Sequence, residues 1–305
     1  MGIDNTGEKL PALTINYNSP AELRSFMDLR GLGMRKKYGQ NFLVNPGIRE
    51  RLLDALEIKP GDAVWEIGPG LGSMTRGLLE RGGRLIAFEI DPAFSKILME
   101  LFGTDKNFTL IEGDALKTWP TAIQEEELLL FGNLPYNIAA ALLGDFIEKK
   151  RFFRRMVVTV QRETAQRMIA RPGTRDYSSF TVLCSSVYKI TPLEIIKGAS
   201  FYPVPRVDSQ GVRFELPEKI LEYPKVFQPL VRGLFSSRRK TIQNNLFNFL
   251  SSVIMKDGKG LIRETLGREA LDLAGISGNR RAETLEIEEF AVLARILEEL
   301  LDRGK

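Results

Sequence analysis

The chain has 305 residues, of which 43% are hydrophobic and 27% are charged, and its formal net charge is +4. This length allows two domains of ordinary size, and the composition is typical of a globular protein. The single cysteine, Cys184, excludes an intrachain disulfide, and the lack of histidine excludes Ser-His-Asp hydrolysis, Cys-His nucleophilic chemistry and most zinc sites.

The first 33 residues contain Pro, Gly and Asn with little periodicity, and we interpret residues 1–33 as an N-terminal extension. They lack the apolar core of a signal peptide, and no run in the chain is long enough for a membrane helix. With only one cysteine, the composition favours a reducing compartment, so we expect a cytoplasmic protein without a membrane partner. In residues 45–58 the apolar positions fit one face of a helix.

From residue 63 onward, apolar runs typical of strands alternate with helical patterns. The expected strands cover residues 63–67, 84–90, 108–113, 127–133 and 153–160. This alternation predicts a mostly parallel sheet with helices on both faces. Two further runs are expected to close the sheet as an antiparallel pair, residues 180–190 and 211–216.

The strand pattern ends after Pro217, and residues 224–301 form amphipathic helical patterns, the last from about Ile287 to Leu301. We therefore predict an α/β fold, a Rossmann-like domain followed by a smaller all-helical C-terminal domain. The predicted boundaries are an N-terminal extension over 1–33, the Rossmann-like domain over 34–217 and the helical domain over 218–305.

Positive charge is concentrated in two segments. Residues 149–175 hold nine Lys or Arg residues and one acid, Glu163, and residues 231–245 hold four cations and no acid. Basic clusters on a nearly neutral protein favour a polyanionic partner such as nucleic acid. Each segment taken alone is equally compatible with a solvated helix face.

A glycine-rich segment, EIGPGLG over residues 66–72, lies between the first expected strand of the sheet and a helix. Glycines there let the backbone approach a ligand closely. Glu89 ends the next strand about 20 residues after Gly68, where an acid typically binds a ribose diol. Asp114, after the third strand, is placed to accept from an adenine amino group. Together these positions predict a nucleoside cofactor, although a tight turn alone explains the glycines and the spacing does not separate NAD from S-adenosylmethionine.

The fourth strand ends in Asn133-Leu134-Pro135-Tyr136, a sequence suited to methylation of an aromatic amine. The lone pair of such an amine is delocalised, so acceptors for its hydrogens would free it. The Asn133 side-chain oxygen and the Pro135 carbonyl are the expected acceptors, and Tyr136 is expected to stack on the base. The methylsulfonium is already activated, so positioning supplies most of the catalysis without histidine. The alternative is an ordinary β-turn.

Nine motifs also point to a known family: KYGQNFL (37–43), EIGPGLGSMT (66–75), FEID (88–91), EGDAL (112–116), NLPYNI (133–138), QxExAxR (161–167), FYPVPRVDS (201–209), RRKT (238–241) and RAE (281–283). From about Arg35 to the C-terminus, the chain resembles the KsgA-type small-subunit ribosomal RNA adenine dimethyltransferases. Arg206 stands where lysine is common in that family. The first 30 or so residues lie outside the resemblance and are given no role.

The resemblance implies that S-adenosylmethionine is bound by Asn41, Leu43, Gly68, Glu89, Asp114 and Asn133. It places Tyr136 and Phe201 on either side of the target adenine, so that the reacting site comprises Asn133, Pro135, Tyr136 and Phe201. Phe201 is also suited to fill the junction between the domains. The basic residues expected to contact RNA are Arg238, Arg239 and Lys240.

The implied reaction is transfer of methyl groups to N6 of two adjacent adenosines near the 3′ end of small-subunit ribosomal RNA. The expected partner is a 30S-type assembly intermediate, and we expect a monomer without a metal. An alternative is the large-subunit methyltransferase that confers antibiotic resistance, whose family typically has Gly-Ser-Gly-Lys and Asn-Ile-Pro-Tyr where this chain has Gly-Pro-Gly-Leu and Asn-Leu-Pro-Tyr. Two alternatives come from other classes of function. One is a non-catalytic assembly or transcription factor on the same scaffold, and the other is a nicotinamide oxidoreductase.

Overall fold

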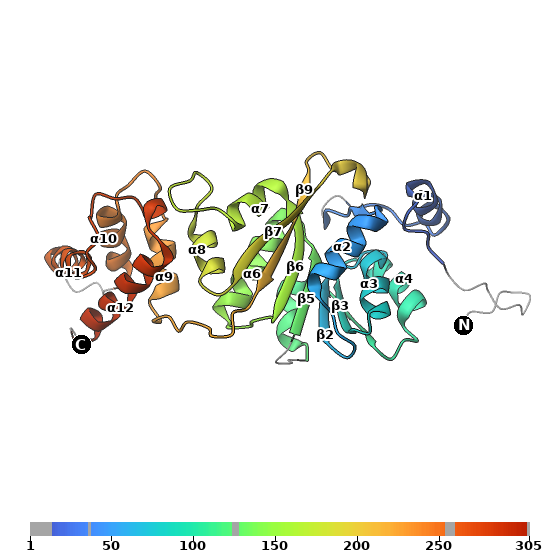
Figure 1. Ribbon diagram of the computed structural model, residues 1–305, viewed down its shortest axis with the longest axis horizontal. Coiled ribbons are helices and arrows are strands. Elements are labelled where there is room, and N and C mark those ends of the chain that lie inside the picture. Colours follow the sequence, from blue (N-terminus) through green and yellow to red (C-terminus); the bar gives the residue numbers. More distant parts are fainter. Residues whose placement is uncertain (1–13, 36–37, 124–127, 254–259, 304–305) are drawn as a thin grey trace, which may run out of the picture. The chain divides into compact units, whose positions relative to one another are not determined.

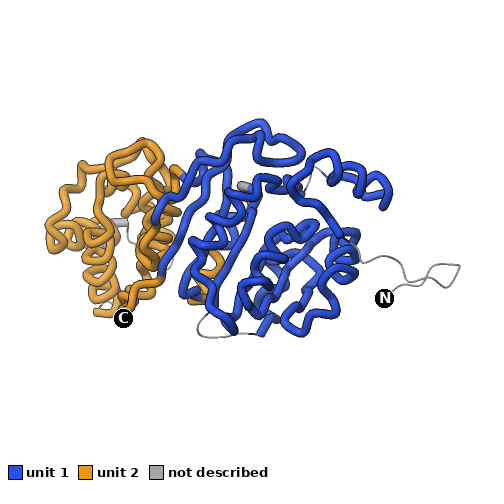
Figure 2. Tube along the Cα trace, turned by 45° about the vertical axis from the view of Figure 1, so that its right-hand side comes forward, with its two compact units in different colours: residues 1–142, 152–165, 191–215 blue, residues 143–151, 166–190, 216–305 orange. Residues whose placement is uncertain are grey.

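The computed structural model describes residues 14–35, 38–123, 128–253 and 260–303, apart from the side chains of residues 136, 137, 253 and 260–262. The chain divides into two compact units (Figure 2). The first unit comprises residues 1–142, 152–165 and 191–215, and the second comprises residues 143–151, 166–190 and 216–305. The second unit therefore includes two segments from the middle of the chain. None of the described helices is long and apolar enough to cross a membrane.

A seven-stranded sheet organises the first unit (Figure 1). Its strands are β2 (Ala63–Ile67), β3 (Arg84–Glu89), β4 (Phe108–Glu112), β5 (Leu128–Asn133), β6 (Arg155–Gln161), β7 (Lys189–Ile196) and β9 (Ser209–Glu215). The strand order is β4-β3-β2-β5-β6-β9-β7, with β4 to β6 parallel and β9 antiparallel to β6. Because β3 and β5 lie on opposite sides of β2, the carboxyl ends of β2 and β5 flank a topological switch point, where α/β proteins bind ligands.

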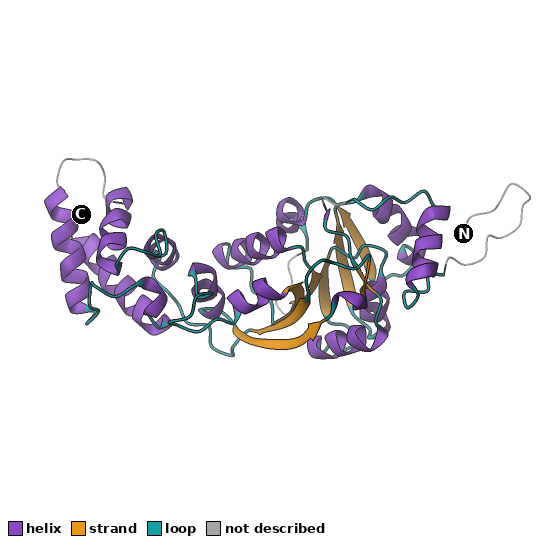
Figure 3. Ribbon diagram, turned by 90° about the horizontal axis from the view of Figure 1, so that it is seen from above, coloured by secondary structure: helices purple, strands orange, loops and turns teal. Residues whose placement is uncertain are grey.

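Helices lie along both faces of the sheet (Figure 3), as the sequence predicts. The α-helices of residues 46–168 are α2 (Pro46–Leu56), α3 (Ser73–Glu80), α4 (Pro92–Phe102), α5 (Ala115–Thr118), α6 (Tyr136–Glu148) and α7 (Arg162–Met168), and both α6 and α7 continue into the second unit. On one face, Val64 of β2 packs in a cluster that includes Leu53, Leu78 and Leu98 from α2, α3 and α4. On the other face, the ring of Trp65 lies 5.5 Å from that of Phe153. Burial on both faces explains the continuous apolar runs of these strands.

A second, two-stranded sheet pairs β1 (Phe42–Leu43) with β8 (Phe201–Tyr202) in antiparallel orientation. Phe42 lies opposite Tyr202 and Leu43 lies opposite Phe201. This pairing joins two motifs that are about 160 residues apart in the sequence.

The N-terminal segment contains a helix that the sequence analysis did not predict. α1 spans Pro20–Leu29, and the Ser19 side chain accepts a hydrogen bond from the Glu22 backbone as its N-cap. Leu23 and Met27 of α1 are buried. The described part of residues 1–33 therefore contains a packed helix, and residues 1–13 lie outside the described residues.

The prediction of a strand over residues 180–190 is wrong for its first half. Residues Ser179–Ser185 form helix α8, which begins with a capping box between Ser178 and Thr181, and β7 starts only at Lys189. Cys184 is buried in α8, as expected for a small hydrophobe. The run of buried apolar and β-branched residues in α8 imitates the pattern of a buried strand.

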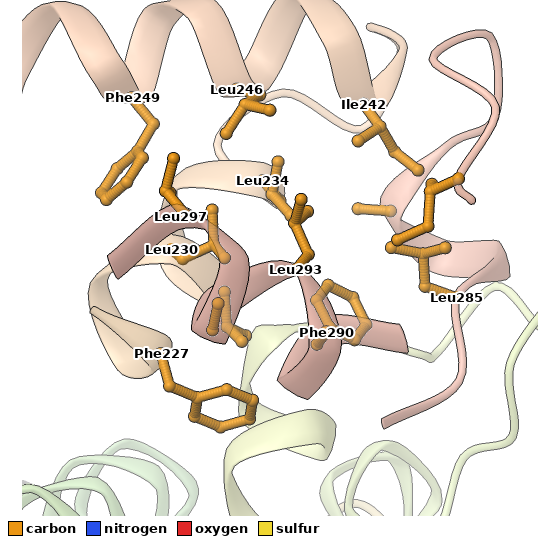
Figure 4. Close-up of a cluster of buried hydrophobic side chains, with 14 of the residues drawn as sticks. Phe227, Leu230, Leu234, Ile242, Leu246, Phe249, Leu285, Phe290, Leu293 and Leu297 are labelled. Carbon is orange, nitrogen blue, oxygen red and sulfur yellow. The ribbon is translucent and has the colours of Figure 1, made fainter. Parts of the chain in front are cut away.

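The second unit is helical, as the sequence predicts for its C-terminal part. Its further helices are α9 (Phe227–Leu234), α10 (Ile242–Val253), α11 (Gly260–Leu273) and α12 (Ile287–Arg303). Their apolar faces meet in a buried cluster (Figure 4) that includes Leu230, Leu234, Leu246, Leu293 and Leu297. Burial of these side chains, each worth about 1.5–3 kcal/mol, holds the unit together.

Candidate active site

A cavity of about 250 Å³ lies at the carboxyl ends of β2, β3 and β5. The structure brings seven of the predicted site residues to its wall: Asn41, Leu43, Gly68, Glu89, Asp114, Asn133 and Pro135. The side chain of Tyr136 and the whole of Lys37 lie outside the described residues. The strands, β1 and the loop after β4 thus converge on one site, as the sequence analysis expected.

The loop Gly68–Gly72, here called the glycine loop, requires glycine at two positions for different reasons. Gly70 has a φ of +60°, and a Cβ there would lie 2.9 Å from the ring of Phe42. Gly72 has a φ of +86° as the N-cap of α3, and its Cβ would lie 2.5 Å from Phe102. Both positions combine a left-handed backbone with no room for a side chain, so the glycines are more than turn formers.

Glu89 lies at the end of β3 with only 4% of its surface exposed. Its Oε2 accepts a hydrogen bond from the Gly70 backbone at 3.0 Å, and its Oε1 accepts one from the Asp91 backbone at 2.8 Å. Burial raises the pKa of this carboxyl, and the backbone donors oppose that effect. Each oxygen retains acceptor capacity, so the carboxylate can still bind the two hydroxyls of a ribose.

Glu66, which the sequence analysis placed in the glycine motif without a role, also lines the cavity. It is 1% exposed, and the Thr75 hydroxyl donates to its Oε2 at 2.7 Å. Burial raises its pKa from 4.5 to about 8. Glu66 is therefore largely protonated near neutral pH. Glu66 and Glu89 both line the cavity, but a side-chain hydroxyl donates to Glu66 whereas two backbone N–H groups donate to Glu89.

This raised pKa predicts a pH-dependent effect of Glu66→Gln. The folded chain binds the Glu66 proton more tightly than the unfolded chain, so this contribution to stability is complete below about pH 4.5 and is lost as pH rises through about 8. Relative to wild type, Glu66→Gln should gain free energy of unfolding between pH 5 and 8, by at most about 1.4 kcal/mol per pH unit. Urea unfolding of both proteins at several pH values measures this difference, and a pH-independent difference contradicts the assignment.

Asn133, at the end of β5, has its side chain fixed from two sides. Its Nδ2 donates to the Asn41 carbonyl at 2.9 Å, and its Oδ1 accepts from the Thr159 hydroxyl at 2.6 Å. Because the Asn41 carbonyl can only accept, the side-chain atom facing it must be the nitrogen, and the oxygen then faces the Thr159 hydroxyl. Oδ1 retains a second lone pair, and Asn133 lines the cavity. Thr159, buried in the apolar run of β6, gives no sequence signal and was missed.

Pro135 does not fit the acceptor role predicted for its carbonyl. That oxygen accepts from the Ile138 backbone at 3.0 Å and from the Ala139 backbone at 3.1 Å, because it begins α6. The neighbouring Leu134 carbonyl has no donor among the residues that the structure describes, and Leu134 lines the cavity. The backbone acceptor at this turn is therefore better assigned to Leu134.

Two other residues of the cavity wall have clear local partners. Asp114 is the N-cap of α5 and accepts from the Leu116 backbone at 3.1 Å through Oδ1, which leaves Oδ2 for a ligand. Gln40 donates to Asp91 at 2.9 Å and accepts from the Arg35 backbone at 2.7 Å, so it fixes the start of β1 against the end of β3. In the sequence, Gln40 stands out only as part of the motif KYGQNFL (37–43).

Phe201 lies apart from these residues. It pairs with Leu43 across the two-stranded sheet, is 3% exposed and packs among Leu52 and Ile196. It is not among the described residues that line the cavity. Stacking on a base would require this ring to leave its present packing, so the predicted role of Phe201 remains a prediction.

The three cations predicted to contact RNA differ in their environments. Arg238 pairs with Glu283 at 2.8 Å and also donates to the Arg175 carbonyl. The Glu283 carbonyl in turn accepts from the Gly173 backbone at 2.6 Å. Arg239 and Lys240 are exposed, and neither has an ion-pair partner within the described ranges. Arg238 therefore ties the loop that carries Arg175 to the turn that carries Arg239 and Lys240.

The basic run over residues 149–175 is not a uniform basic face. Arg154 pairs with Asp62 at 2.6 Å. Arg155 pairs with Glu57 at 2.7 Å and Glu215 at 3.1 Å. These two arginines form ion pairs within the first unit. Other cations in the run are exposed, among them Arg171 and Arg175. In the part of the chain that the structure describes, no three Cys, Asp or Glu residues are grouped to hold a metal ion.

Known proteins resemble the chain over nearly its whole length. A family model described as ribosomal RNA adenine dimethylase matches residues 31–296. A protein of Treponema denticola named ribosomal RNA small subunit methyltransferase A is 44% identical over 92% of this chain and 96% of its own. The unmatched part of this chain is shorter than 33 residues, so the similarity reaches into the N-terminal segment that was expected to lie outside it.

Two solved structures are also similar. A dimethyladenosine transferase from Plasmodium falciparum has a TM-score of 0.69 and 26% identity, covering 84% of this chain and 97% of its own. The 23S rRNA methyltransferase ErmE has a TM-score of 0.60 and 25% identity, covering 84% of this chain and 99% of its own. The extent of the family match and the 44% identity to a relative of nearly full length show that the chain belongs to the ribosomal RNA adenine dimethylase family.

Proposed function

We propose that this protein transfers methyl groups from S-adenosylmethionine to N6 of two adjacent adenosines near the 3′ end of small-subunit ribosomal RNA. One observation supports this most directly: Glu89, Asp114 and Asn133, predicted separately from three strand ends, line a single cavity beside the glycine loop. The name of the Treponema relative supports the small subunit as the target, in preference to the large subunit that the name of ErmE indicates.

The residues of the cavity fit S-adenosylmethionine by their chemistry. In this proposal Glu89 accepts the ribose hydroxyls, the unused oxygen of Asp114 accepts from the adenine amine, and the glycine loop allows close backbone contact. The bound cofactor supplies a methyl group that is already activated. The chain therefore has to bind and orient the reactants and exclude water, which suits a chain without histidine.

Asn133 and Leu134 supply the acceptors for the target amine in this proposal. The Asn133 Oδ1 has one lone pair left beside the Thr159 hydroxyl, and the Leu134 carbonyl is not engaged within the described residues. Accepting both amine hydrogens draws the nitrogen toward a tetrahedral geometry and frees its lone pair for the methyl group. The target adenine must be unpaired or flipped out, because a duplex hides this amine. Tyr136 and Phe201 are the proposed stacking partners.

The partner of this enzyme is proposed to be a small-subunit assembly intermediate, bound in the cytoplasm by a monomer. The second unit, including the residues after 217, is the proposed docking element because it presents Arg171, Arg175, Arg239 and Lys240 on loops that Arg238 and Glu283 hold together. Phosphate contacts of this kind are independent of base sequence, so they position the substrate while the cavity selects the base.

A direct test uses labelled S-adenosylmethionine with small subunits from a strain that lacks the methylation, and large subunits as the control substrate. We expect label only on the small subunit, at two adjacent adenosines near the 3′ end of its RNA, as dimethyladenosine. Mass spectrometry of nuclease fragments locates the label. Label on the large subunit alone contradicts the proposed substrate, and no transfer to either subunit contradicts the proposed activity.

The contrasting environments of the cations predict different salt dependences. Removing Arg239 and Lys240 together should flatten the fall of log affinity with log salt, by about 0.7–0.9 for each phosphate that the protein no longer neutralises. Arg238→Ala should change the slope less, because its charge is shared with Glu283, but it should lower affinity by loosening the loop at Arg175. Filter binding of ribosomal RNA at several salt concentrations tests this. An unchanged slope for Arg239→Ala/Lys240→Ala means that these two cations are exposed to solvent and do not contact phosphates of the RNA.

A further inference from the structure

The N-terminal segment over residues 14–34, here called the N-terminal clamp, packs directly on the walls of the cavity. Ile15, Tyr17, Leu23 and Met27 from the clamp are all buried. They share one apolar cluster with residues of β1, the glycine loop and α4: Phe42, Val44, Leu71, Phe94 and Ile97. Phe42 and Phe94 also line the cavity. The clamp therefore lies behind residues that face the ligand.

Tyr17 makes a direct polar contact with the glycine loop. Its hydroxyl donates to the Leu71 carbonyl at 2.8 Å, and both residues are buried. Leu71 lies between Gly70 and Gly72, whose left-handed backbones give the loop its shape. A buried carbonyl needs a hydrogen-bond partner, and no other donor to this one is present among the described residues. The hydroxyl of Tyr17 thus fixes the middle of the loop.

Arg49 of α2 fixes the same segment to β1. Its guanidinium donates to the Leu43 carbonyl at 2.9 Å and to the Tyr17 carbonyl at 3.4 Å, and it also contacts the Asn18 side chain. On the apolar side, the ring of Phe42 lies against Gly70 and 5.7 Å from that of Phe94. Two independent routes, one polar and one apolar, therefore connect the clamp to the glycine loop and to β1.

We propose that the N-terminal clamp is a positioning element of the cofactor site, in which the Tyr17 hydroxyl holds the glycine loop in the geometry that binds S-adenosylmethionine. The proposal rests on the proposed function, because it takes S-adenosylmethionine as the ligand of the cavity. Tyr17 itself does not line the cavity, so its effect on the ligand passes through Leu71 and Gly70. The role is specific to a segment that the motifs leave without a function.

The test compares Tyr17→Phe with Tyr177→Phe, which is a matched control. Tyr177 is also buried and also donates its hydroxyl to a backbone carbonyl, that of Leu285 at 3.0 Å, but within the second unit. Both variants should lose similar thermal stability. Only Tyr17→Phe should raise the Kd for S-adenosylmethionine in calorimetry, by about two- to tenfold, the range for loss of one buried hydrogen bond.

Kinetics separate positioning from a general loss of structure. Tyr17→Phe should raise the KM for S-adenosylmethionine and leave kcat nearly unchanged at saturating cofactor. An unchanged Kd and KM, with the same loss of thermal stability as in Tyr177→Phe, overturns the proposal. If the wild-type protein itself fails to bind S-adenosylmethionine, the proposed function fails instead of the clamp.

A second pair of variants tests the apolar route. It also keeps the proposal testable if Tyr17→Phe or Tyr177→Phe fails to fold. Leu23 in α1 and Leu246 in α10 are both fully buried leucines in separate clusters. Leu23→Ala should raise the Kd for S-adenosylmethionine at least as much as Tyr17→Phe, because it loosens the packing behind Phe42. Leu246→Ala should destabilise the chain without changing that Kd. Equal Kd values in these two variants overturn the apolar part of the proposal.

Discussion

Replacing Asn133 by alanine should slow methyl transfer by about 10²–10³-fold, the usual loss on removing one preorganised polar group at a reacting centre. The substitution removes the Oδ1 acceptor that the proposal assigns to the amine. It also removes the donor to the Asn41 carbonyl, so the residue before β1 loses this hydrogen bond to the end of β5. Binding of ribosomal RNA should persist, because the phosphate contacts proposed for the second unit do not involve Asn133.

Thr159→Val provides the graded comparison for Asn133→Ala. Valine preserves the shape of the buried side chain but cannot donate to the Asn133 Oδ1, which then loses its 2.6 Å partner. We expect a rate loss smaller than that of Asn133→Ala, because the acceptor is still present but less well oriented. Single-turnover methylation and RNA affinity should be measured on the same preparations. A nearly wild-type rate for Asn133→Ala makes Asn133 a turn residue and contradicts the proposed chemistry.

The predicted site residues that line the cavity share one physical origin. Parallel strands buried on both faces are continuous apolar runs, so β2, β3 and β5 are visible in the sequence, and the polar residue after each run lies at a known edge of the sheet. The edge strand β4 is more exposed, and its position follows from the alternation of strand and helix patterns. Glu89, Asp114 and Asn133 follow from this rule and from the order of the strands. Their convergence did not require any side-chain contact to be known.

The residues that were missed depend on contacts distant in the sequence. Thr159 sits in an apolar strand and becomes relevant only because β6 pairs beside β5. The partner of Arg238 is 45 residues away, so its ion pair with Glu283 could not be read from a local charge pattern. The start of α1 did have a local signal, Ser19-Pro20-Ala21-Glu22, which is typical of a helix N-terminus. The apolar face of α1 is short, with only Leu23 and Met27 buried, so the periodicity of apolar residues does not indicate a helix.

Removing the carboxylate of Glu89 should weaken S-adenosylmethionine binding by at least about tenfold, since hydrogen bonds to charged groups are each worth about 1.5–3 kcal/mol. Glu89→Ala strands the Gly70 and Asp91 backbone donors and removes the acceptor for the ribose. Glu89→Gln should be nearly as damaging, because one carboxylate oxygen becomes an amide donor facing a backbone N–H or a ribose hydroxyl. A matched control is Glu112→Ala, since Glu112 lies beside Glu89 in the register of β4 and β3 but is exposed and outside the cavity lining.

Calorimetry with S-adenosylmethionine and with NAD distinguishes the two ligands that this fold commonly binds. The acid at the end of β3 serves a ribose in either case, so the effect of Glu89→Ala alone does not identify the cofactor. We expect wild-type protein and Glu112→Ala to bind S-adenosylmethionine with the same Kd, and NAD neither to bind measurably nor to compete. Tighter binding of NAD than of S-adenosylmethionine by the wild-type protein contradicts the cofactor assignment. Full retention of S-adenosylmethionine binding by Glu89→Ala contradicts the geometry instead, because the buried carboxylate would then serve only to hold the glycine loop through Gly70.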